Sequence, residues 1–237
     1  MAPSTHRPAP AIPAPMRLLA IDTALEACSV GVSAGDGSSP VLASEVIGKG
    51  HAERLLPMIA TAMADAGLAF AELDRIAVTI GPGSFTGVRI GIAAARGLAL
   101  VGGCAMVGIG TLAALAEKAR SVSGARPVLA VLDARRDEVY GQLFAADGTP
   151  ATEPTVGDAA RFAGLIGPDT LLAGSGAEAV AAVAGVGEGR IVHREAHPDI
   201  AAVLRLGRAA PPSVAPPRPL YLRPPDARPQ AGSVARR

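Results

Sequence analysis

A carboxylate at the end of an apolar run and a glycine-rich loop further along the chain hold the residues best suited to chemistry. Asp22 and Thr23 follow the apolar run that begins at Arg17. A carboxylate in this place can hold a metal-bound water near a phosphate, whose oxygens would face the N–H groups of the turn. Alternatively, the Asp22 side chain bonds only to its own turn. A single Asp-Thr pair is a weak signal, and the spacing alone favours this second interpretation.

The loop Gly81-Pro82-Gly83-Ser84-Phe85-Thr86-Gly87 lies between an apolar run and a helical pattern. It is not a Walker loop, because no Gly-Lys-Ser/Thr follows it. It does not fit the nucleophile elbow, and its glycines are misspaced for a dinucleotide fingerprint. The loop therefore indicates a tight turn that leads into a helix N-terminus, and both a structural and a phosphate-binding role stay open.

Two further segments lie in the second half of the chain. Asp133 ends an apolar run, and Gly174-Ser175-Gly176 follows another and precedes a helical pattern. The glycines could pass under an adenine or a ribose, although a plain strand-to-helix turn is the favoured interpretation. His193 and His197 are four residues apart, but the order H-x-E-x-H is not that of a zinc protease, and Pro198 follows at once, so we expect no metal there.

The elements that would position these residues alternate between strands and helices. Strand patterns open the chain at 17–21, 27–34 and 41–47, and they recur at 75–80, 104–109, 128–132, 138–144 and 171–173. Helix patterns cover 52–66, 88–101 and 111–119, with Pro57 predicting a kink or a late start in the first of them. The order predicts two similar α/β halves.

Composition restricts the class of protein without naming a function. The 237 residues carry a net charge of only +1, which argues against a strongly basic nucleic-acid surface. Cys28 and Cys104 are expected to be buried free thiols. The proline-rich start lacks a signal-peptide pattern, and no continuous apolar run reaches the roughly 18 residues of a membrane span. We therefore expect a cytoplasmic globular protein.

Four segments together closely resemble the TsaB (YeaZ) family. They are LLAIDTALEACSVGV (18–32), GHAERLLPMI (50–59), GPGSFTGVRIGIAAARGLAL (81–100) and VLAVLDARRDEVYGQLF (128–144), and PLYLR (219–223) is a fifth, shorter match. They follow the order of the family and span most of the chain. The GPGSFTGVRIG run combined with the IDTA opening is the most specific of these signals.

The resemblance implies an α/β actin/hexokinase-like (ASKHA) fold with two ribonuclease H-like domains. The expected division is a disordered extension at 1–16, an N-terminal domain at 17–109, a second and partly degenerate domain at 110–223, and a flexible tail at 224–237.

The resemblance also implies a role. Members bind and activate a TsaD-type catalytic paralogue, together with a TsaE-type ATPase. The complex transfers threonylcarbamoyl to the adenosine beside the tRNA anticodon. A family member of this type is expected to contact tRNA only as part of the complex. The paralogue holds its metal with an H-x-x-x-H pair, whereas the matching residues here are Thr111 and Leu115. The chain is therefore expected to be non-catalytic, with no metal and no cofactor of its own, and with nucleotide at the complex interface left open.

The predicted partner interface lies on the helices at 52–66 and 88–101, and the same face would allow a homodimer when the chain is alone. Its residues are His51, Glu53, Leu55, Leu56, Ile59, Met63, Arg89, Ile92, Ala93 and Arg96. A vestigial nucleotide site would comprise Asp22, Thr23, Asp133, Gly174 and Gly176. The alternatives are a nucleotide-dependent phosphotransferase of the same fold, a metallopeptidase centred on the late histidines, and an interaction module without a role in tRNA modification.

Overall fold

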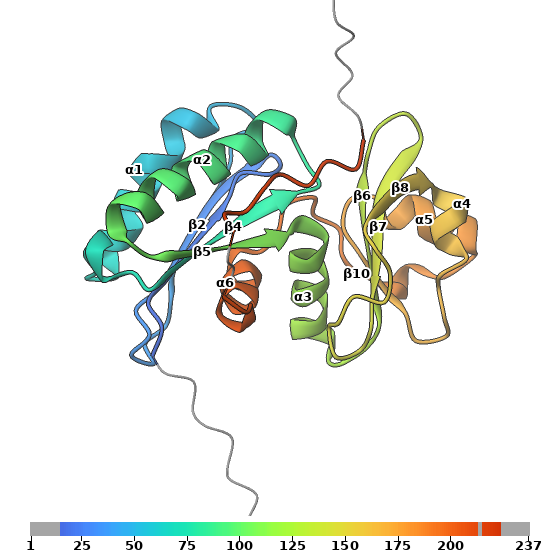
Figure 1. The fold of residues 1–237 in the computed structure, drawn as a ribbon. Helices are drawn as coiled ribbons and strands as arrows, with labels where there is room; N and C mark the ends of the chain where they lie inside the picture. Colours follow the sequence, from blue (N-terminus) through green and yellow to red (C-terminus); the bar gives the residue numbers. More distant parts are fainter. Residues whose placement is uncertain (1–14, 213–214, 224–237) are drawn as a thin grey trace, which may run out of the picture.

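The computed structural model describes residues 15–212 and 215–223. The predicted extension at 1–16 and the predicted tail at 224–237 fall almost entirely outside these residues. The described chain forms two lobes side by side, each built on one five-stranded sheet (Figure 1).

The sheet of the first lobe has the strand order β3-β2-β1-β4-β5. Its strands are β1 (Leu18–Asp22), β2 (Ala27–Ser33), β3 (Val41–Val46), β4 (Arg75–Gly81) and β5 (Ala105–Gly110). The first three form an antiparallel meander, while β4 and β5 run parallel to β1. The parallel register, with Ile21 opposite Val78 and Thr79 opposite Ile109, brings the carboxyl ends of β1, β4 and β5 to one edge of the sheet.

The sheet of the second lobe repeats this topology, with the strand order β10-β9-β6-β7-β8. Its strands are β6 (Val128–Asp133), β7 (Glu138–Phe144), β8 (Thr155–Asp158), β9 (Leu171–Ala173) and β10 (Ile191–His193). Here β6 pairs antiparallel with β7 and parallel with β9, as β1 does with β2 and β4. The two sheets confirm the predicted α/β actin/hexokinase-like fold of two ribonuclease H-like halves.

The helices cover both faces of each sheet. They are α1 (His51–Asp65), α2 (Phe85–Gly102), α3 (Thr111–Ser123), α4 (Ala159–Ala163), α5 (Ala177–Ala184) and α6 (Ile200–Ala209), with short 3-10 turns η1 (Phe70–Glu72) and η2 (Glu188–Arg190). Helices α1 and α2 pack together on one face of the first sheet, and α6 packs on the other face. Helix α3 lies between the lobes and packs against α6 and against the second sheet, whose far side carries α4 and α5 (Figure 1).

Helix α1 continues through Pro57, where the sequence predicts a kink or a late start. It begins at His51, so Pro57 lies inside the helix and does not delay its start. Helix α2 begins three residues earlier than its pattern predicts, because Ser84 caps it by accepting a hydrogen bond from the Gly87 N–H at 3.2 Å.

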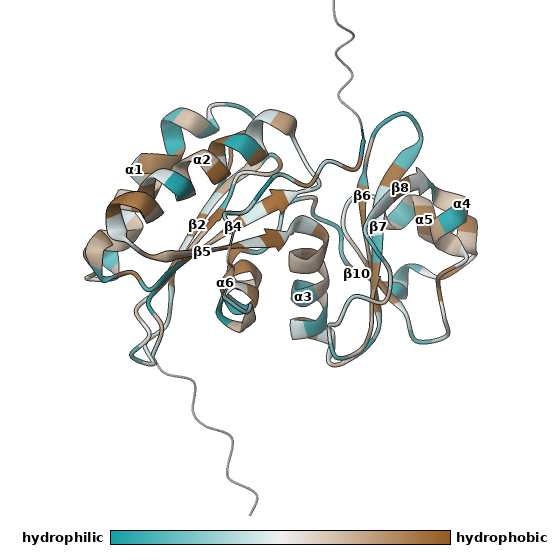
Figure 2. Cartoon of the chain, viewed as in Figure 1, coloured by the Kyte–Doolittle hydropathy of each residue, from teal (hydrophilic) through white to brown (hydrophobic). Residues whose placement is uncertain are grey.

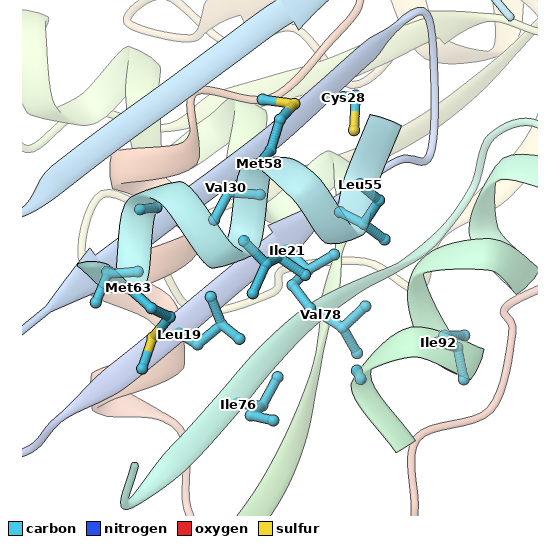
Figure 3. Packing of buried hydrophobic residues seen from close by; sticks show 14 of the residues in the cluster. Leu19, Ile21, Cys28, Val30, Leu55, Met58, Met63, Ile76, Val78 and Ile92 are labelled. Atoms are coloured by element: carbon cyan, nitrogen blue, oxygen red, sulfur yellow. The ribbon is translucent and has the colours of Figure 1, made fainter. Parts of the chain in front are cut away.

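The core of the first lobe forms where α1 and α2 meet the sheet. Side chains from β1, β2, β4 and both helices point toward one another, as Leu19, Val30, Leu55 and Ile76 do in Figure 3. Full burial of an aliphatic side chain of this size contributes about 1.5–3 kcal/mol. Figure 2 shows the same hydrophobic character along the strands, and it also shows hydrophobic stretches along α1 and α2.

The lobes do not follow the predicted division of the sequence at 109/110. Although α6 falls within the predicted second domain, its Ile200, Val203 and Leu204 pack with Leu18 and Ala20 of β1. The chain therefore returns to the first lobe after β10. The reason is that the sheet has a second apolar face, which α1 and α2 leave uncovered and α6 buries.

Candidate functional site

The turn between β1 and β2 is sealed inside the first lobe. Asp22, Thr23 and Ala24 are all 0% exposed. One carboxylate oxygen of Asp22, Oδ1, accepts hydrogen bonds from the Thr79 hydroxyl at 2.6 Å and from the Ala24 N–H at 3.1 Å. The second contact is the self-bonded turn that the sequence favours over a phosphate site.

The glycine-rich loop closes directly on this turn. Ser84 N–H donates to the Ala24 carbonyl at 2.7 Å, and the Thr23 hydroxyl donates to the Gly87 carbonyl at 2.7 Å. A Cβ atom on Gly83 would lie 2.3 Å from the Ala24 oxygen, and one on Gly87 would lie 2.1 Å from the Thr23 oxygen. The glycines are therefore required for contact between two segments of backbone, and the room that a phosphate would need is filled by the β1–β2 turn.

Burial sets the electrostatics of this turn. It raises the pKa of the Asp22 carboxyl, against the lowering effect of the Thr79 and Ala24 hydrogen bonds and of the nearby His197 and His51. The other carboxylate oxygen, Oδ2, is buried without a protein partner. A carboxyl group in this environment resists ionisation, which is unfavourable for the carboxylate role that a phosphotransferase would require.

The second-lobe residues of the predicted nucleotide site are also accounted for by packing. Gly176 N–H donates to the Val131 carbonyl at 3.2 Å, and a Cβ atom on Gly174 would lie 2.2 Å from that same oxygen. Ser175 Oγ accepts a hydrogen bond from the Asp133 N–H at 3.1 Å, which ties this turn to the end of β6. Asp133 itself is exposed, and its Oδ1 accepts from the Arg135 N–H at 2.7 Å. These contacts are those of the strand-to-helix turn that the sequence favours.

The late histidines do not gather further ligands. His193 is partly buried, which lowers its pKa, and His197 Nε2 lies 3.8 Å from Glu195. Within the described ranges no three His, Cys, Asp or Glu side chains come together as a metal site. At the positions that match the histidine pair of the catalytic paralogue, Thr111 is fully buried and Leu115 is a core residue of the second lobe.

The two cysteines are free thiols as predicted, but only Cys28 is fully buried as expected, and Cys104 is partly buried. Burial raises the pKa of the Cys28 thiol to about 11, so it stays protonated at neutral pH.

The predicted partner interface is assigned to helices α1 and α2, but only half of its residues are exposed. Glu53, Leu56, Arg89, Ala93 and Arg96 are exposed. The other five are core side chains that are at most 7% exposed and that pack toward the sheet: His51, Leu55, Ile59, Met63 and Ile92. The prediction of these five as interface residues is corrected, because the helical repeat that marks an apolar face in the sequence marks the buried face here.

Sequence reasoning missed part of the exposed surface of α2. Leu100 and Val101 are each 86% exposed, and Leu56 of α1 is 54% exposed. Five small residues of the same two helices are also exposed: Ala52, Ala60, Ala64, Ala93 and Gly97. We call these eight residues the α1–α2 face. The sequence feature that could have revealed this face is the pair Leu100-Val101, which extends α2 beyond its last buried residue, Ala95.

A pocket of about 320 Å³ borders this face. Four of its lining residues are Arg89, Ile92, Ala93 and Arg96 of α2. Pro219 and Tyr221 of the C-terminal segment complete it, and neither was assigned a function in the sequence analysis.

Helix α2 is also long and apolar enough to span a membrane, judged by length and composition alone. The sequence pattern had indicated no such run, because Arg89 and Arg96 interrupt it. In the structure Gly87, Gly91 and Ala95 of this helix are buried against the first lobe. A Cβ atom on Gly91 would lie 2.5 Å from the Thr23 hydroxyl oxygen, so α2 is an integral layer of the α/β fold.

Comparisons with known proteins agree with this architecture. The sequence model of the family described as TsaD, tRNA N6-adenosine threonylcarbamoyltransferase, matches residues 34–205. The TsaB protein of Escherichia coli, named a tRNA threonylcarbamoyladenosine biosynthesis protein, is 44% identical over 132 residues, which are 56% of each chain. The match thus spans about half the length of that curated relative. An uncharacterized Mycobacterium tuberculosis protein is 37% identical over 216 residues, which cover 90% of this chain and 95% of that one.

Two solved structures from Pseudomonas aeruginosa share the whole architecture. One is an uncharacterized protein with similarity to peptidase YEAZ, with a TM-score of 0.73, 32% identity, and coverage of 88% of this chain and 100% of that chain. The other is YeaZ itself, with a TM-score of 0.68, 35% identity, and coverage of 81% and 90%. With the two-lobed fold, the sealed β1–β2 turn and the α1–α2 face in place, these similarities show that the chain belongs to the TsaB/YeaZ family of tRNA threonylcarbamoyladenosine biosynthesis proteins.

Proposed function

We propose that this chain is a non-catalytic subunit that binds and activates a TsaD-type catalytic paralogue in the transfer of threonylcarbamoyl to the adenosine beside the tRNA anticodon. The observation that carries the proposal is the α1–α2 face. It combines three highly exposed aliphatic side chains, Leu56, Leu100 and Val101, with small residues that let another helix pair approach closely.

The paralogue is the occupant that best fits this face. The family model that matches residues 34–205 carries the name of the transferase itself, so the catalytic protein and this chain share a sequence pattern that includes α1 and α2. Two related helix pairs can pack face to face as a four-helix contact. Small and aliphatic residues lose little side-chain entropy in such a contact. A second copy of this chain presents the same helix pair, so a homodimer is the competing assembly.

The residues of this chain support a non-catalytic role. The β1–β2 turn and the Gly174–Gly176 turn are filled by backbone, and Thr111 and Leu115 cannot supply the paralogue's metal ligands. We therefore assign it no cofactor, and we propose that any nucleotide is held at the complex interface. A TsaE-type ATPase would be the third member of the assembly. The small net charge of +1 fits contact with tRNA only through the complex, in the cytoplasm.

The proposal is tested by co-purification with the TsaD-type paralogue and reconstitution of tRNA modification. We expect the intact chain to form a complex and the modification to require it. Leu56→Asp and Leu100→Asp each place a charge on the α1–α2 face, and each should weaken binding at least about 30-fold, the loss typical of a central interface residue. Val183→Asp is the matched control, since Val183 is an equally exposed helical side chain (56%) in the second lobe.

Four outcomes would contradict the proposal. If Val183→Asp weakened the complex as much as Leu56→Asp, the α1–α2 face would not be the binding surface. If modification proceeded at full rate without this chain, the activating role would be wrong. ATP turnover by the isolated chain would instead favour the phosphotransferase, and stoichiometric zinc lost in His197→Ala would favour the metallopeptidase.

A further inference from the structure

The segment Pro217–Arg223, which we call the strap, lies against the first lobe. Arg96 of α2 donates to the Pro217 carbonyl at 2.7 Å, and Leu220 N–H donates to the Ile80 carbonyl of β4 at 2.7 Å. A Cβ atom on Gly81 would lie 2.9 Å from the Leu220 oxygen, so β4 and the strap are in close backbone contact. These bonds fix one end of the strap to α2 and β4.

An aromatic and arginine cluster strengthens this attachment. The rings of Phe85 and Tyr221 stack with centroids 5.3 Å apart, and the Arg89 guanidinium lies 3.6 Å from the Phe85 centroid. Arg89 Nε also donates to the Tyr221 hydroxyl at 2.7 Å. The cluster joins the first turn of α2 to the strap through both stacking and a hydrogen bond.

The last described residue of the strap reaches the other lobe. In Figure 1 this segment, in orange-red, runs from the side of β4 to the upper end of the β6–β7 hairpin. Arg223 donates through Nη1 to the Ala134 carbonyl at 2.9 Å and through Nη2 to the Glu138 carboxylate. Ala134 and Glu138 are the two residues that bracket the β6–β7 turn.

This turn has an unusual backbone. Its three central residues, Arg135, Arg136 and Asp137, have φ angles of 61°, 56° and 58°, in the left-handed region. Side chains with a Cβ adopt that region reluctantly, and three in succession are held only where the surroundings over-determine them. Within the hairpin the turn is closed by Ala134 N–H to the Glu138 carbonyl at 2.9 Å and by Glu138 N–H to the Arg135 carbonyl at 3.2 Å.

We propose that Arg223 is a positioning residue that clamps the β6–β7 turn from outside, and that the strap thereby couples this turn to α2. A guanidinium suits the task because its fork of donors reaches a carbonyl and a carboxylate at the same time, which a single ammonium cannot do with the same geometry. The inference stands whether or not the α1–α2 face binds a paralogue, because each contact that carries it lies within this chain.

Amide hydrogen exchange of the full chain, read residue by residue by NMR, tests the clamp. In Arg223→Gln we expect the Ala134 and Glu138 amides to exchange at least tenfold faster, while the amides at the centre of β6 stay within twofold of the wild type. Arg223→Lys should restore part of the protection. Arg218→Gln, the same change at an exposed strap position, is the control and should leave the turn unchanged.

A second variant tests the coupling. Tyr221→Ala removes the contact with Arg89 and Phe85. The clamp predicts faster exchange at Ala134 and Glu138, although the contacts of Tyr221 among the described residues are with α2 and not with the turn. Unchanged turn exchange in Arg223→Gln would overturn the clamp. An equal acceleration throughout β6 would overturn it as well, since it would reveal a general loss of stability. Unchanged exchange in Tyr221→Ala would overturn the coupling through the strap.

Discussion

The two lobes share one topology but hold their corresponding first turns in opposite ways. In the first lobe Thr23 and Ala24, the two residues that follow β1, are fully buried, and the glycine-rich loop contacts their backbone. In the second lobe Ala134 is buried, but the three residues that follow it, 135–137, are exposed, and Arg223 binds the turn through the Ala134 carbonyl. The start of the turn after the first strand is thus fully buried in one lobe, whereas the centre of the corresponding turn is exposed in the other.

The same contrast extends to the helices. Helices α1 and α2 have 15 and 18 residues, whereas α4 and α5 have five and eight. The longer pair covers the first sheet and still leaves aliphatic side chains outside. The contrast between the two turns can be tested by substitutions that disrupt each of them separately.

The largest effect is expected where backbone meets backbone, at Gly87. An alanine there would bring its Cβ within 2.1 Å of the Thr23 oxygen, which cannot move without disturbing the β1–β2 turn. We expect Gly87→Ala to lower the free energy of unfolding by about 3 kcal/mol or more, as overpacking of a rigid core does. Urea denaturation measures the loss.

Gly97→Ala is the matched control on the same helix. Nothing lies within 4 Å of its added Cβ, and Gly97 is exposed. Alanine is the better helix former, so this variant should gain about 0.5–1 kcal/mol. If both variants lost stability equally, the sealed turn would not explain the glycines of α2.

A smaller and pH-dependent effect is expected at Asp22. Burial raises its pKa, so the folded chain binds the carboxyl proton more tightly than the unfolded chain does. The contribution of this group to stability is present below the unfolded pKa of about 3.9, and it is lost as the pH rises through the higher folded pKa. Asp22→Asn keeps the acceptor for Thr79 and Ala24 and cannot ionise, so it should be more stable than the wild type near neutral pH.

Urea titrations at about pH 4 and about pH 8 check this sign, because the advantage of Asp22→Asn should shrink toward the lower pH. An advantage of equal size at both values would show that the Asp22 carboxyl does not change its charge inside the lobe.

The exposed turn of the second lobe should respond in the opposite direction to the sealed one, gaining stability from an added glycine. Asp137 has a φ of 58°, and a non-glycine residue in this region costs roughly 1–2 kcal/mol. Asp137→Gly and Asp137→Ala both remove the charge, but only the first removes the Cβ. We expect the glycine variant to be about 1 kcal/mol more stable than the alanine variant in urea denaturation. Equal stabilities would mean that the turn relaxes out of the left-handed region.

The sequence predicts the fold better than it predicts the surfaces. The alternating strand patterns and the IDTA and GPGSFTG segments suffice for two α/β halves, because each pattern depends on neighbouring residues. They could not show that Gly83 and Gly87 contact the β1–β2 turn, since that contact joins residues about 60 positions apart. An apolar helical repeat likewise cannot separate the buried Leu55 from the exposed Leu56 without knowledge of the sheet beneath them.

The smallest effect on stability is expected for the ion pair between Lys118 of α3 and Asp199, the residue before α6. Their charged atoms are 2.6 Å apart, and the side chains are 32% and 25% exposed, so solvent screens the pair. Partial burial acts to raise the pKa of Asp199, but the Lys118 ammonium and the Ala201 N–H outweigh it and hold that pKa below its usual range. The stability from this pair is therefore present above the unfolded pKa of about 3.9, and it is lost as the pH falls through the folded pKa, the reverse of Asp22.

Asp199→Asn isolates this ion pair, because the amide oxygen can still cap α6 by accepting from Ala201 N–H. We expect a loss of about 0.5–1 kcal/mol at neutral pH, reduced in 1 M salt and absent at low pH. A double-mutant cycle with Lys118→Gln measures the coupling. A coupling that survived both salt and acid would mean that α3 and α6 are held together by packing at this point.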